Sequence, residues 1–335
     1  MNADAADGPP TRAKVLAAFA AVYLLWGSTY LAIRIAIETL PPLLMAGTRF
    51  LLAGALMFAW LRMRGEAAPE RRQWRPAAIV GGLLLLGGNG GVVLAERTVP
   101  SGVAALLVAM VPLWMVLLEW WRGGGTRPTL RTAVGLGVGF AGMVLLVGPA
   151  ELAGGGGVDP AGAAMLMVAC ASWATGSIYS RGAELPRSPF MATAMEMMCG
   201  GGLLLLAGIG RGEPASVDVA SFSAASVAAF VYLVLFGSLV GFTAYVWLLR
   251  VSTPARVSTY AYVNPVVAVF LGWALAGEPL TPRVLMAAAV IVGAVAVITA
   301  GRTAAAGQPA GAGNRFLRVS PRPPSVCLTG GERDF

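Results

Sequence analysis

The chain has 335 residues, of which 57% are hydrophobic and 12% are charged, and its formal net charge is +8. About a quarter of the residues of an ordinary soluble domain are charged, so this composition argues against a soluble enzyme and indicates lipid as the solvent. The basic residues are scattered along the chain rather than gathered in one patch, which argues against nucleic acid as a partner.

Ten apolar stretches follow one another along the chain, and a helix needs roughly 20 such residues to cross the hydrocarbon core. In chain order they are 15–33, 43–61, 77–95, 98–118, 132–150, 160–180, 189–210, 219–249, 257–277 and 284–301. Backbone groups in lipid must satisfy their own hydrogen bonds, and the stretches lack the alternating polarity of barrel strands. The sequence therefore predicts an all-α membrane protein with ten transmembrane helices.

The loops between these stretches differ in charge. Most of the 24 basic residues lie in alternate loops and in the two termini, whereas the other loops hold only Arg97, Arg211 and Arg283. Cytoplasmic loops carry the excess of Lys and Arg in membrane proteins. We therefore expect a multi-pass protein of the cytoplasmic membrane with both termini in the cytoplasm.

The two halves of the chain repeat each other. Three residues of the first half, Trp26, Arg34 and Pro42, recur 147 residues later as Trp173, Arg181 and Pro189, and later pairs such as Pro112 and Pro265 differ by 153. Five helices is an odd number, so the second copy enters the membrane from the opposite side, which makes an inverted repeat. The alternative is chance similarity between apolar helices.

This repeat divides the chain into five parts. They are a cytoplasmic N-terminal tail (1–14), a first repeat (15–150), a Gly-rich external linker (151–160), a second repeat (161–301) and a disordered cytoplasmic tail (302–335).

Two charged residues lie inside predicted spans. Arg49 and Glu196 also differ by 147, so they occupy equivalent positions in the second and seventh helices. A charge within the membrane costs about 2.5–3.5 kcal/mol on insertion scales and usually faces a cavity or a partner. We expect a role in binding substrate or in coupling, and the alternative is a structural salt bridge or snorkelling.

Two prolines lie well inside the predicted fourth and ninth helices. Pro112 and Pro265 each remove a backbone hydrogen bond, which would free the carbonyl oxygens of Val108 and Ala261. Broken helices near the midplane are where carriers present backbone groups to substrate, so both prolines are predicted helix breaks. A simple packing kink is the alternative.

Asn89 lies in the run Gly87-Gly88-Asn89-Gly90-Gly91, deep in the third helix. This run resembles a phosphate-binding loop only superficially, and the spacing from Gly87 to Gly91 favours close helix packing, with Asn89 facing a cavity. Asn264 precedes Pro265 and shares a helix face with Tyr260.

Aromatic residues complete the predicted substrate site. Trp26, Tyr30, Trp173, Tyr245 and Tyr260 could stack on a planar substrate, although aromatic residues are also common at membrane interfaces and in packing. The predicted substrate-binding set is therefore Trp26, Tyr30, Arg49, Asn89, Trp173, Glu196, Tyr245, Tyr260 and Asn264.

The chain contains no histidine and no nucleotide-binding motif of the Walker type. We therefore expect no metal site, no cofactor and no catalytic triad, and any proton coupling must use carboxylates such as Glu196 or Glu96.

Several segments of residues 17–300 resemble the EamA transporters of the drug/metabolite transporter superfamily, and within them the YedA-like branch. In the first half these segments are 26–30, 41–50, 88–91 and 99–102, and in the second half 172–173, 236–238, 260–265 and 277–278. The resemblance implies a ten-helix inverted-repeat carrier with a central cavity, often an exporter of amino acids, other metabolites or drugs. One departure is that Gly277-Glu278 has no counterpart 153 residues earlier, at Gly125. We interpret Glu278 as a structural residue at a helix end.

The sequence thus predicts a secondary transporter that exports small metabolites, amino acids or related compounds, or drugs, by alternating access. Its expected partners are a small-molecule substrate and membrane lipid, while a proton or counter-ion as driving force and a homodimer are left open. The alternatives are an intramembrane enzyme or a sensory scaffold, both disfavoured because no catalytic cluster or soluble output domain is apparent, and, more weakly, a channel.

Overall fold

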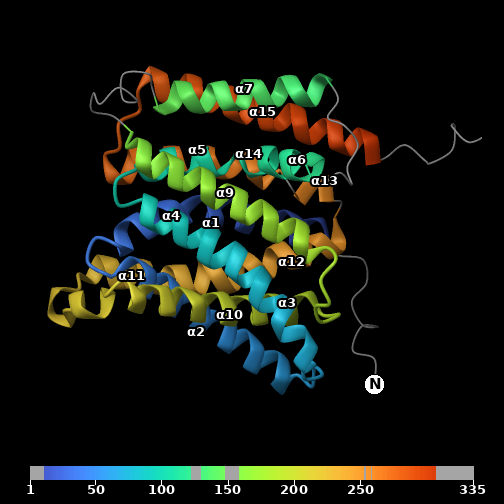
Figure 1. The fold of residues 1–335 in the computed structure, drawn as a ribbon, viewed down its shortest axis with the longest axis vertical. Helices are drawn as coiled ribbons and strands as arrows, with labels where there is room; N and C mark the ends of the chain where they lie inside the picture. The colour runs from blue at the N-terminus through green and yellow to red at the C-terminus, as the bar shows by residue number, and fades with distance from the viewer. Residues whose placement is uncertain (1–10, 122–129, 148–157, 253, 258, 307–335) are drawn as a thin grey trace, which may run out of the picture.

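The computed structural model describes residues 11–121, 130–147, 158–252, 254–257 and 259–306. All regular structure in these ranges is helical (Figure 1). The elements of the first half are α1 (Arg12–Ala36), α2 (Pro42–Met63), α3 (Arg71–Gly81), η1 (Gly82–Asn89), α4 (Gly90–Ala95), α5 (Ser101–Val108), α6 (Val111–Trp121) and α7 (Leu130–Val147).

The second half contains α9 (Pro160–Ser180), α10 (Pro189–Gly210), η2 (Glu213–Ser216), η3 (Val219–Ser221), α11 (Ala224–Tyr232), η4 (Leu233–Val240), α12 (Gly241–Val251), α13 (Pro254–Val257), α14 (Tyr260–Ala276) and α15 (Pro282–Ala306). Here η2 and η3 are short 3₁₀ turns, whereas η1 and η4 are π-helical.

Seven helical stretches in the described ranges are long and apolar enough to cross a membrane: 12–36, 42–63, 71–95, 101–121, 160–180, 189–210 and 224–251. Three shorter apolar helices are Ala133–Leu146, Tyr260–Ala276 and Pro282–Val297. The prediction of an all-α membrane protein is confirmed, while the count of ten spans stays a prediction.

The packing of the helices follows the repeat. In an inverted repeat, every helix contact should be matched by a contact between the equivalent pair. The second helices of the two halves, α2 and α10, pack together, as do the fifth helices, α7 and α15, and the fourth, α5 and α14 (Figure 1). Likewise α1 contacts η4 and α12 of the eighth span, and α9 contacts η1 and α4 of the third. Each half therefore packs its first helix against the third span of the other half.

The largest buried cluster lies between α5, α6, α7, α9 and α15, and a second one lies between α1, α2, η1 and η4. Both clusters contain residues from the two halves, so neither half has a separate core.

Glycines allow α2 and α10 to approach until their backbones touch. A Cβ on Gly201 would lie 2.5 Å from the Leu51 backbone nitrogen and 2.9 Å from the Gly47 carbonyl oxygen. Helices in lipid associate through close packing of small residues, because the hydrophobic effect contributes little between them.

We expect Gly201→Ala to separate these helices and to lower the amount of folded protein, because the atoms that its methyl group would meet belong to the backbone. Gly202→Ala is the matched control, since a Cβ on Gly202 meets nothing within 4 Å. Thermal unfolding in detergent, followed by size-exclusion chromatography, checks this result. Equal unfolding temperatures for the two variants would contradict the close approach.

The glycines at positions 87 and 91 allow the third span to pack closely against α9, as the sequence predicts. A Cβ on Gly87 would lie 2.1 Å from Ser172 Oγ, and one on Gly91 would lie 2.8 Å from Ala169 Cβ, both on α9. The prediction that this run permits close packing is confirmed.

The third and eighth spans both change to π-helix near their middle. Gly82–Asn89 and Leu233–Val240 are eight residues each and lie at corresponding places in the two halves. A π-helical turn shifts the hydrogen-bond pattern by one residue, is rare, and frequently occurs at functional sites.

The two prolines behave differently. The fourth span is divided between Val108 and Val111, directly before Pro112. Pro265, in contrast, lies inside α14, which runs without interruption from Tyr260 to Ala276. Pro265 therefore does not break its helix as expected, because a helix interior can continue past the one hydrogen bond that proline removes when the turns on both sides are held by packing.

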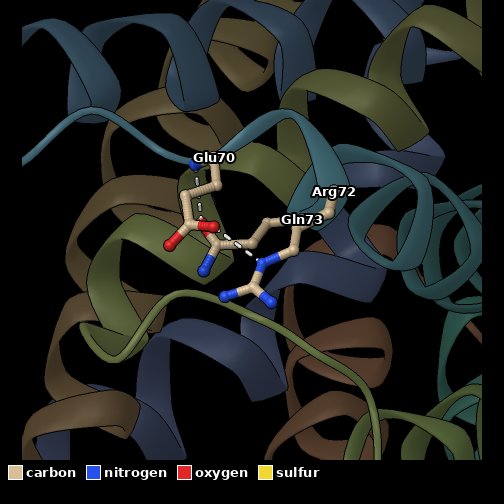
Figure 2. Close-up of polar contacts among 3 residues, drawn as sticks. All are labelled: Glu70, Arg72 and Gln73. Atoms are coloured by element: carbon tan, nitrogen blue, oxygen red, sulfur yellow. Dashed lines mark hydrogen bonds and ion pairs between the residues drawn. The ribbon is translucent and has the colours of Figure 1, made fainter.

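The start of the third span is held by contacts between neighbouring residues (Figure 2). The Glu70 backbone N–H donates to Gln73 Oε1 at 2.9 Å, and Arg72 Nε lies 2.7 Å from Glu70 Oε2. The N–H to side-chain bond satisfies a backbone donor at the helix start. The ion pair is exposed, so water and salt screen it and it adds little to the stability of the helix.

Candidate functional site

Arg49 is the buried cation of the described helices. Its side chain on α2 is 3% exposed, and its Nε donates to Ser238 Oγ on η4 at 2.9 Å. The guanidinium carbon lies 4.4 Å from the centroid of the Phe50 ring, and Nη1 is buried without a hydrogen-bond partner. A buried donor without a partner is costly, so this guanidinium is able to bind a further acceptor.

Trp26 on α1 contacts the same π-helix, η4, as Arg49 does. Its Nε1 donates to the Gly237 carbonyl oxygen at 3.2 Å, one residue before the Arg49 partner. The Trp26 ring centroid lies 5.0 Å from that of Tyr245 and 5.3 Å from that of Tyr260, and the two tyrosine rings are 5.7 Å apart. The structure thus brings three of the five predicted aromatic residues together.

Asn264 fixes this aromatic cluster to the backbone. It is 7% exposed, and with its amide oriented to suit its neighbours, Nδ2 donates to the carbonyl oxygens of Tyr260 and Tyr23 at 3.2 Å.

Tyr30 is one turn beyond Trp26 on α1, packs against the largest buried cluster, and interacts electrostatically with Glu96. We call the set Trp26, Tyr30, Arg49, Tyr245, Tyr260 and Asn264 the Arg49 half-site.

The remaining predicted residues form a second group around η1. Trp173 on α9 packs on Gly88, where a Cβ would lie 2.8 Å from Trp173 Cε3. Asn89 ends η1, and its Oδ1 is buried without a hydrogen-bond partner. Glu196 on α10 is half-buried, and its backbone carbonyl oxygen packs against Gly81. We call Asn89, Trp173 and Glu196 the Glu196 half-site.

The two half-sites are built in the same way. Each combines a tryptophan from the first helix of one repeat, a charged residue from the second helix, and the π-helix of the other repeat. Within the described ranges, no ion pair or hydrogen bond joins Arg49 to Glu196; the Arg49 hydrogen bond is taken by Ser238. Each half-site contains one polar atom that is buried without a hydrogen-bond partner, Arg49 Nη1 in the first and Asn89 Oδ1 in the second.

Two carboxylates tie the halves together at one end of the bundle. Glu278 accepts from the backbone N–H groups of Ser101 and Gly102, at 2.7 and 2.9 Å, and so caps α5. Glu213 accepts from the N–H groups of Leu43 and Leu44, both within 3.0 Å, and caps α2. The interpretation of Glu278 as a structural residue at a helix end is confirmed.

Sequence reasoning missed the role of Glu213 and of Ser238. A signal for Glu213 was present, because Gly212-Glu213-Pro214 repeats the motif Gly277-Glu278-Pro279, and both glycines have positive φ, 78° and 66°. A residue in this left-handed conformation ends a helix and turns the chain toward the next one. No pattern singled out Ser238, because an isolated serine in an apolar helix carries no such signal.

A third contact between the halves lies at the start of α9. Asp159 Oδ2 accepts from Thr98 Oγ1 at 2.7 Å, and its two carboxylate oxygens also accept from the N–H groups of Ala161 and Gly162. The hydrogen bond from Thr98, followed by that from Ala161, lowers the pKa of Asp159 below its usual value. Asp159 therefore stays charged as the cap of α9.

Two cavities lie outside both half-sites. An apolar groove of about 450 Å³ is lined by α1, α14 and Tyr232, and a second one of about 380 Å³ lies beside Glu278. No predicted site residue lines either of them. The central cavity implied by the resemblance stays a prediction.

Comparison with known proteins agrees with this architecture. The model of the EamA-like transporter family matches residues 13–148 and 160–300. YedA of Escherichia coli K12, named as an uncharacterized inner membrane transporter, is 43% identical over 273 residues, which cover 81% of this chain and 86% of YedA. YvbV of Bacillus subtilis, named as an uncharacterized transporter, is 25% identical over 287 residues, which cover 85% of this chain and 90% of YvbV.

A solved structure titled "Crystal structure of protein" has a TM-score of 0.59 to this chain, with 23% identity and coverage of 86% of this chain and 98% of the other. At this identity the likeness concerns the fold alone.

Proposed function

Because this chain belongs to the EamA-like transporter family, which makes it a membrane transporter, we propose that it is a secondary carrier that exports small metabolites by alternating access. The observation that supports alternating access is the exchange of elements between the halves. Each half-site takes its π-helix from the other repeat, so a rocking motion of the repeats would open and close both half-sites together.

The chemistry of the half-sites supports an amino acid or a related zwitterion as substrate. Arg49 Nη1 is a free, charged donor that would hold a carboxylate, and Glu196 would hold an ammonium group. The rings of Trp26, Tyr245 and Tyr260 would pack the substrate's side chain. The same rings support planar drugs as a second substrate class. The export direction rests on the family resemblance.

Counterflow in proteoliposomes tests the carrier. Purified protein is reconstituted in vesicles loaded with one unlabelled amino acid at a time, and entry of the labelled form is measured. We expect saturable, transient accumulation above the equilibrium level for at least one amino acid. Conversion of the labelled compound without net movement would favour an intramembrane enzyme, and non-saturable flux would favour a channel.

We propose that the carrier resides in the inner membrane, as the name of YedA states for that relative, with both termini in the cytoplasm. Reporters fused in the loop 62–75, at 122–131 and at the C-terminus should all report a cytoplasmic location, because these segments carry the excess of arginine. An external location at any one of the three would contradict the ten-span topology.

A further inference from the structure

Glu96 is a fully buried carboxyl group that lies outside the two half-sites. It follows α4, its exposed fraction is 0%, and neither of its carboxyl oxygens has a hydrogen-bond partner among the described residues. The neighbouring Arg34 donates through Nη1 to the Glu96 backbone carbonyl oxygen. A charged carboxylate buried without donors is very costly, and such a group usually takes up a proton instead.

The charged surroundings of Glu96 would allow this proton to leave again. Its carboxyl group interacts electrostatically with Arg34 of α1, Arg49 of α2 and Glu278 beyond α14. The titratable groups on the packed elements are Tyr30 on α1, Cys170 on α9 beside Tyr30, and Asp159 at the start of α9, which is bonded to Thr98. The two arginines favour the carboxylate, whereas burial and Glu278 favour the neutral acid.

We propose that Glu96 is a proton-binding site: a neutral acid in the conformation described here, and a carboxylate paired with Arg34 or Arg49 in the opposite conformation. Arg49 belongs to the Arg49 half-site and also interacts with Glu96. Substrate binding at Arg49 would therefore change the proton affinity of Glu96. The use of this proton to drive transport rests on the carrier function proposed above, whereas proton binding itself does not.

Infrared difference spectroscopy of the purified protein in lipid, between acidic and alkaline buffer, tests proton binding. We expect the carbonyl absorption that titrates in the wild type to lose one component in Glu96→Gln, and we expect that component to be retained in the control Glu196→Gln. Glu96→Asp should keep a band with a shifted midpoint, which separates a lost proton site from a misfolded variant. An unchanged band in a folded Glu96→Gln variant would overturn the assignment.

A second arm tests the coupling. Counterflow of the amino acid carried by the wild type is measured with and without an imposed pH gradient. We expect the gradient to accelerate wild-type flux several-fold and to leave Glu96→Gln exchange unaffected. A Glu96 band without any flux in the wild type would overturn the carrier and keep the proton site. Flux in Glu96→Gln that still follows the gradient would overturn the coupling role alone.

An independent observation concerns the carboxylate caps. Gly65 and Gly212 differ by 147 and both have positive φ, 83° and 78°, and each is followed by a glutamate. Glu213 caps α2 with both oxygens, but Oε2 of its counterpart Glu66 is buried without a hydrogen-bond partner. The groups equivalent to Leu43 and Leu44 are Phe190 and Met191 at the start of α10, where the Met191 N–H reaches only Ser188 Oγ, at 3.4 Å.

We infer that Glu213 and Glu66 act as alternating latches: each glutamate caps a helix of the other half at its own membrane face, and only one of the two caps is formed in each conformation. In the conformation described here Glu213 joins the halves at the external end, while Glu66 at the cytoplasmic end makes no equivalent contact with α10 among the described residues. The inverted repeat predicts that the opposite conformation exchanges the two states, with Glu66 capping α10 and the Glu213 cap broken. This inference requires the same carrier function and no role of Glu96.

Cysteine accessibility tests the latches in a background in which Cys170, Cys199 and Cys327 are serine. The reporters are Val99→Cys at the external end and Ala77→Cys at the cytoplasmic end, both 0% exposed, labelled with a maleimide on either side of oriented vesicles. We expect Glu213→Ala to raise labelling of the external reporter several-fold and Glu66→Ala to lower it, with opposite changes at the cytoplasmic reporter.

Glu38→Ala, at an exposed external position, is the control and should change neither reporter. Glu213→Gln keeps one acceptor and should give an intermediate shift, which serves if Glu213→Ala does not fold. Shifts of the same sign in the Glu213 and Glu66 variants, or no shift in either, would overturn the alternation.

Discussion

Replacing Arg49 by Gln should raise the apparent KM for the carried amino acid about ten- to hundredfold while leaving the protein in the membrane. Charge-assisted hydrogen bonds of this kind contribute about 1.5–3 kcal/mol, and each 1.4 kcal/mol corresponds to a factor of ten. Gln retains a donor for Ser238 Oγ, which the Arg49 Nε now bonds, so the contact between α2 and η4 has a substitute. Counterflow at equal membrane abundance measures the effect, and Arg72→Gln, in an exposed ion pair, is the control.

The exchange Arg49→Glu with Glu196→Arg separates binding from structure. No ion pair joins these two residues in the described structure, so a structural role for the pair has no contact to restore. We expect normal abundance without recovered transport of the same substrate. Recovered transport would favour a fixed ion pair over a substrate site, and full transport by Arg49→Gln and Glu196→Gln alone would remove both residues from the mechanism.

Replacing Trp26 by Ala should reduce both transport and stability. The change removes the hydrogen bond to Gly237 and the ring contacts with Tyr245 and Tyr260, and large-to-small substitutions of packed aromatic residues cost about 3–5 kcal/mol. Trp26→Phe keeps a ring but loses the hydrogen bond, so it should fold at near-normal abundance with a smaller loss of transport.

Thermal unfolding and counterflow on the same preparations measure these effects. The equivalent pair Trp173→Ala and Trp173→Phe provides an internal comparison, because Trp173 packs on Gly88 of η1. Unchanged counterflow in Trp26→Ala would show that the aromatic cluster lies outside the transport path.

The fold class was predictable from the sequence because lipid imposes strong constraints. Runs of about 20 apolar residues can only be helices in lipid, and the offset of 147 between Trp26 and Trp173 shows the repeat without any structure. The same offset placed Arg49 and Glu196 on equivalent helices, and the structure shows that these helices, α2 and α10, pack together.

The details of the site were less predictable. Nothing in the sequences of Gly82–Asn89 and Leu233–Val240 predicts a π-helix rather than an α-helix. Both segments are apolar, as α-helical membrane spans are, and the two helix types differ only by one residue in the spacing of their hydrogen bonds. The partner of Arg49 is a serine on another repeat, which depends on tertiary packing. Pro265 was predicted to break its helix, but local sequence does not contain the neighbouring helices that hold α14 together.

The central claim is that one substrate binds between a guanidinium and a carboxylate from opposite halves. The most direct test compares three forms of the amino acid found by counterflow: the free zwitterion, its methyl ester and its N-acetyl derivative. We expect only the zwitterion to exchange in the wild type, and we expect the preference for the free acid over the ester to vanish in Arg49→Gln and the preference for the free amine over the acetyl derivative to vanish in Glu196→Gln. Equal exchange of all three forms by the wild type would contradict the proposed site.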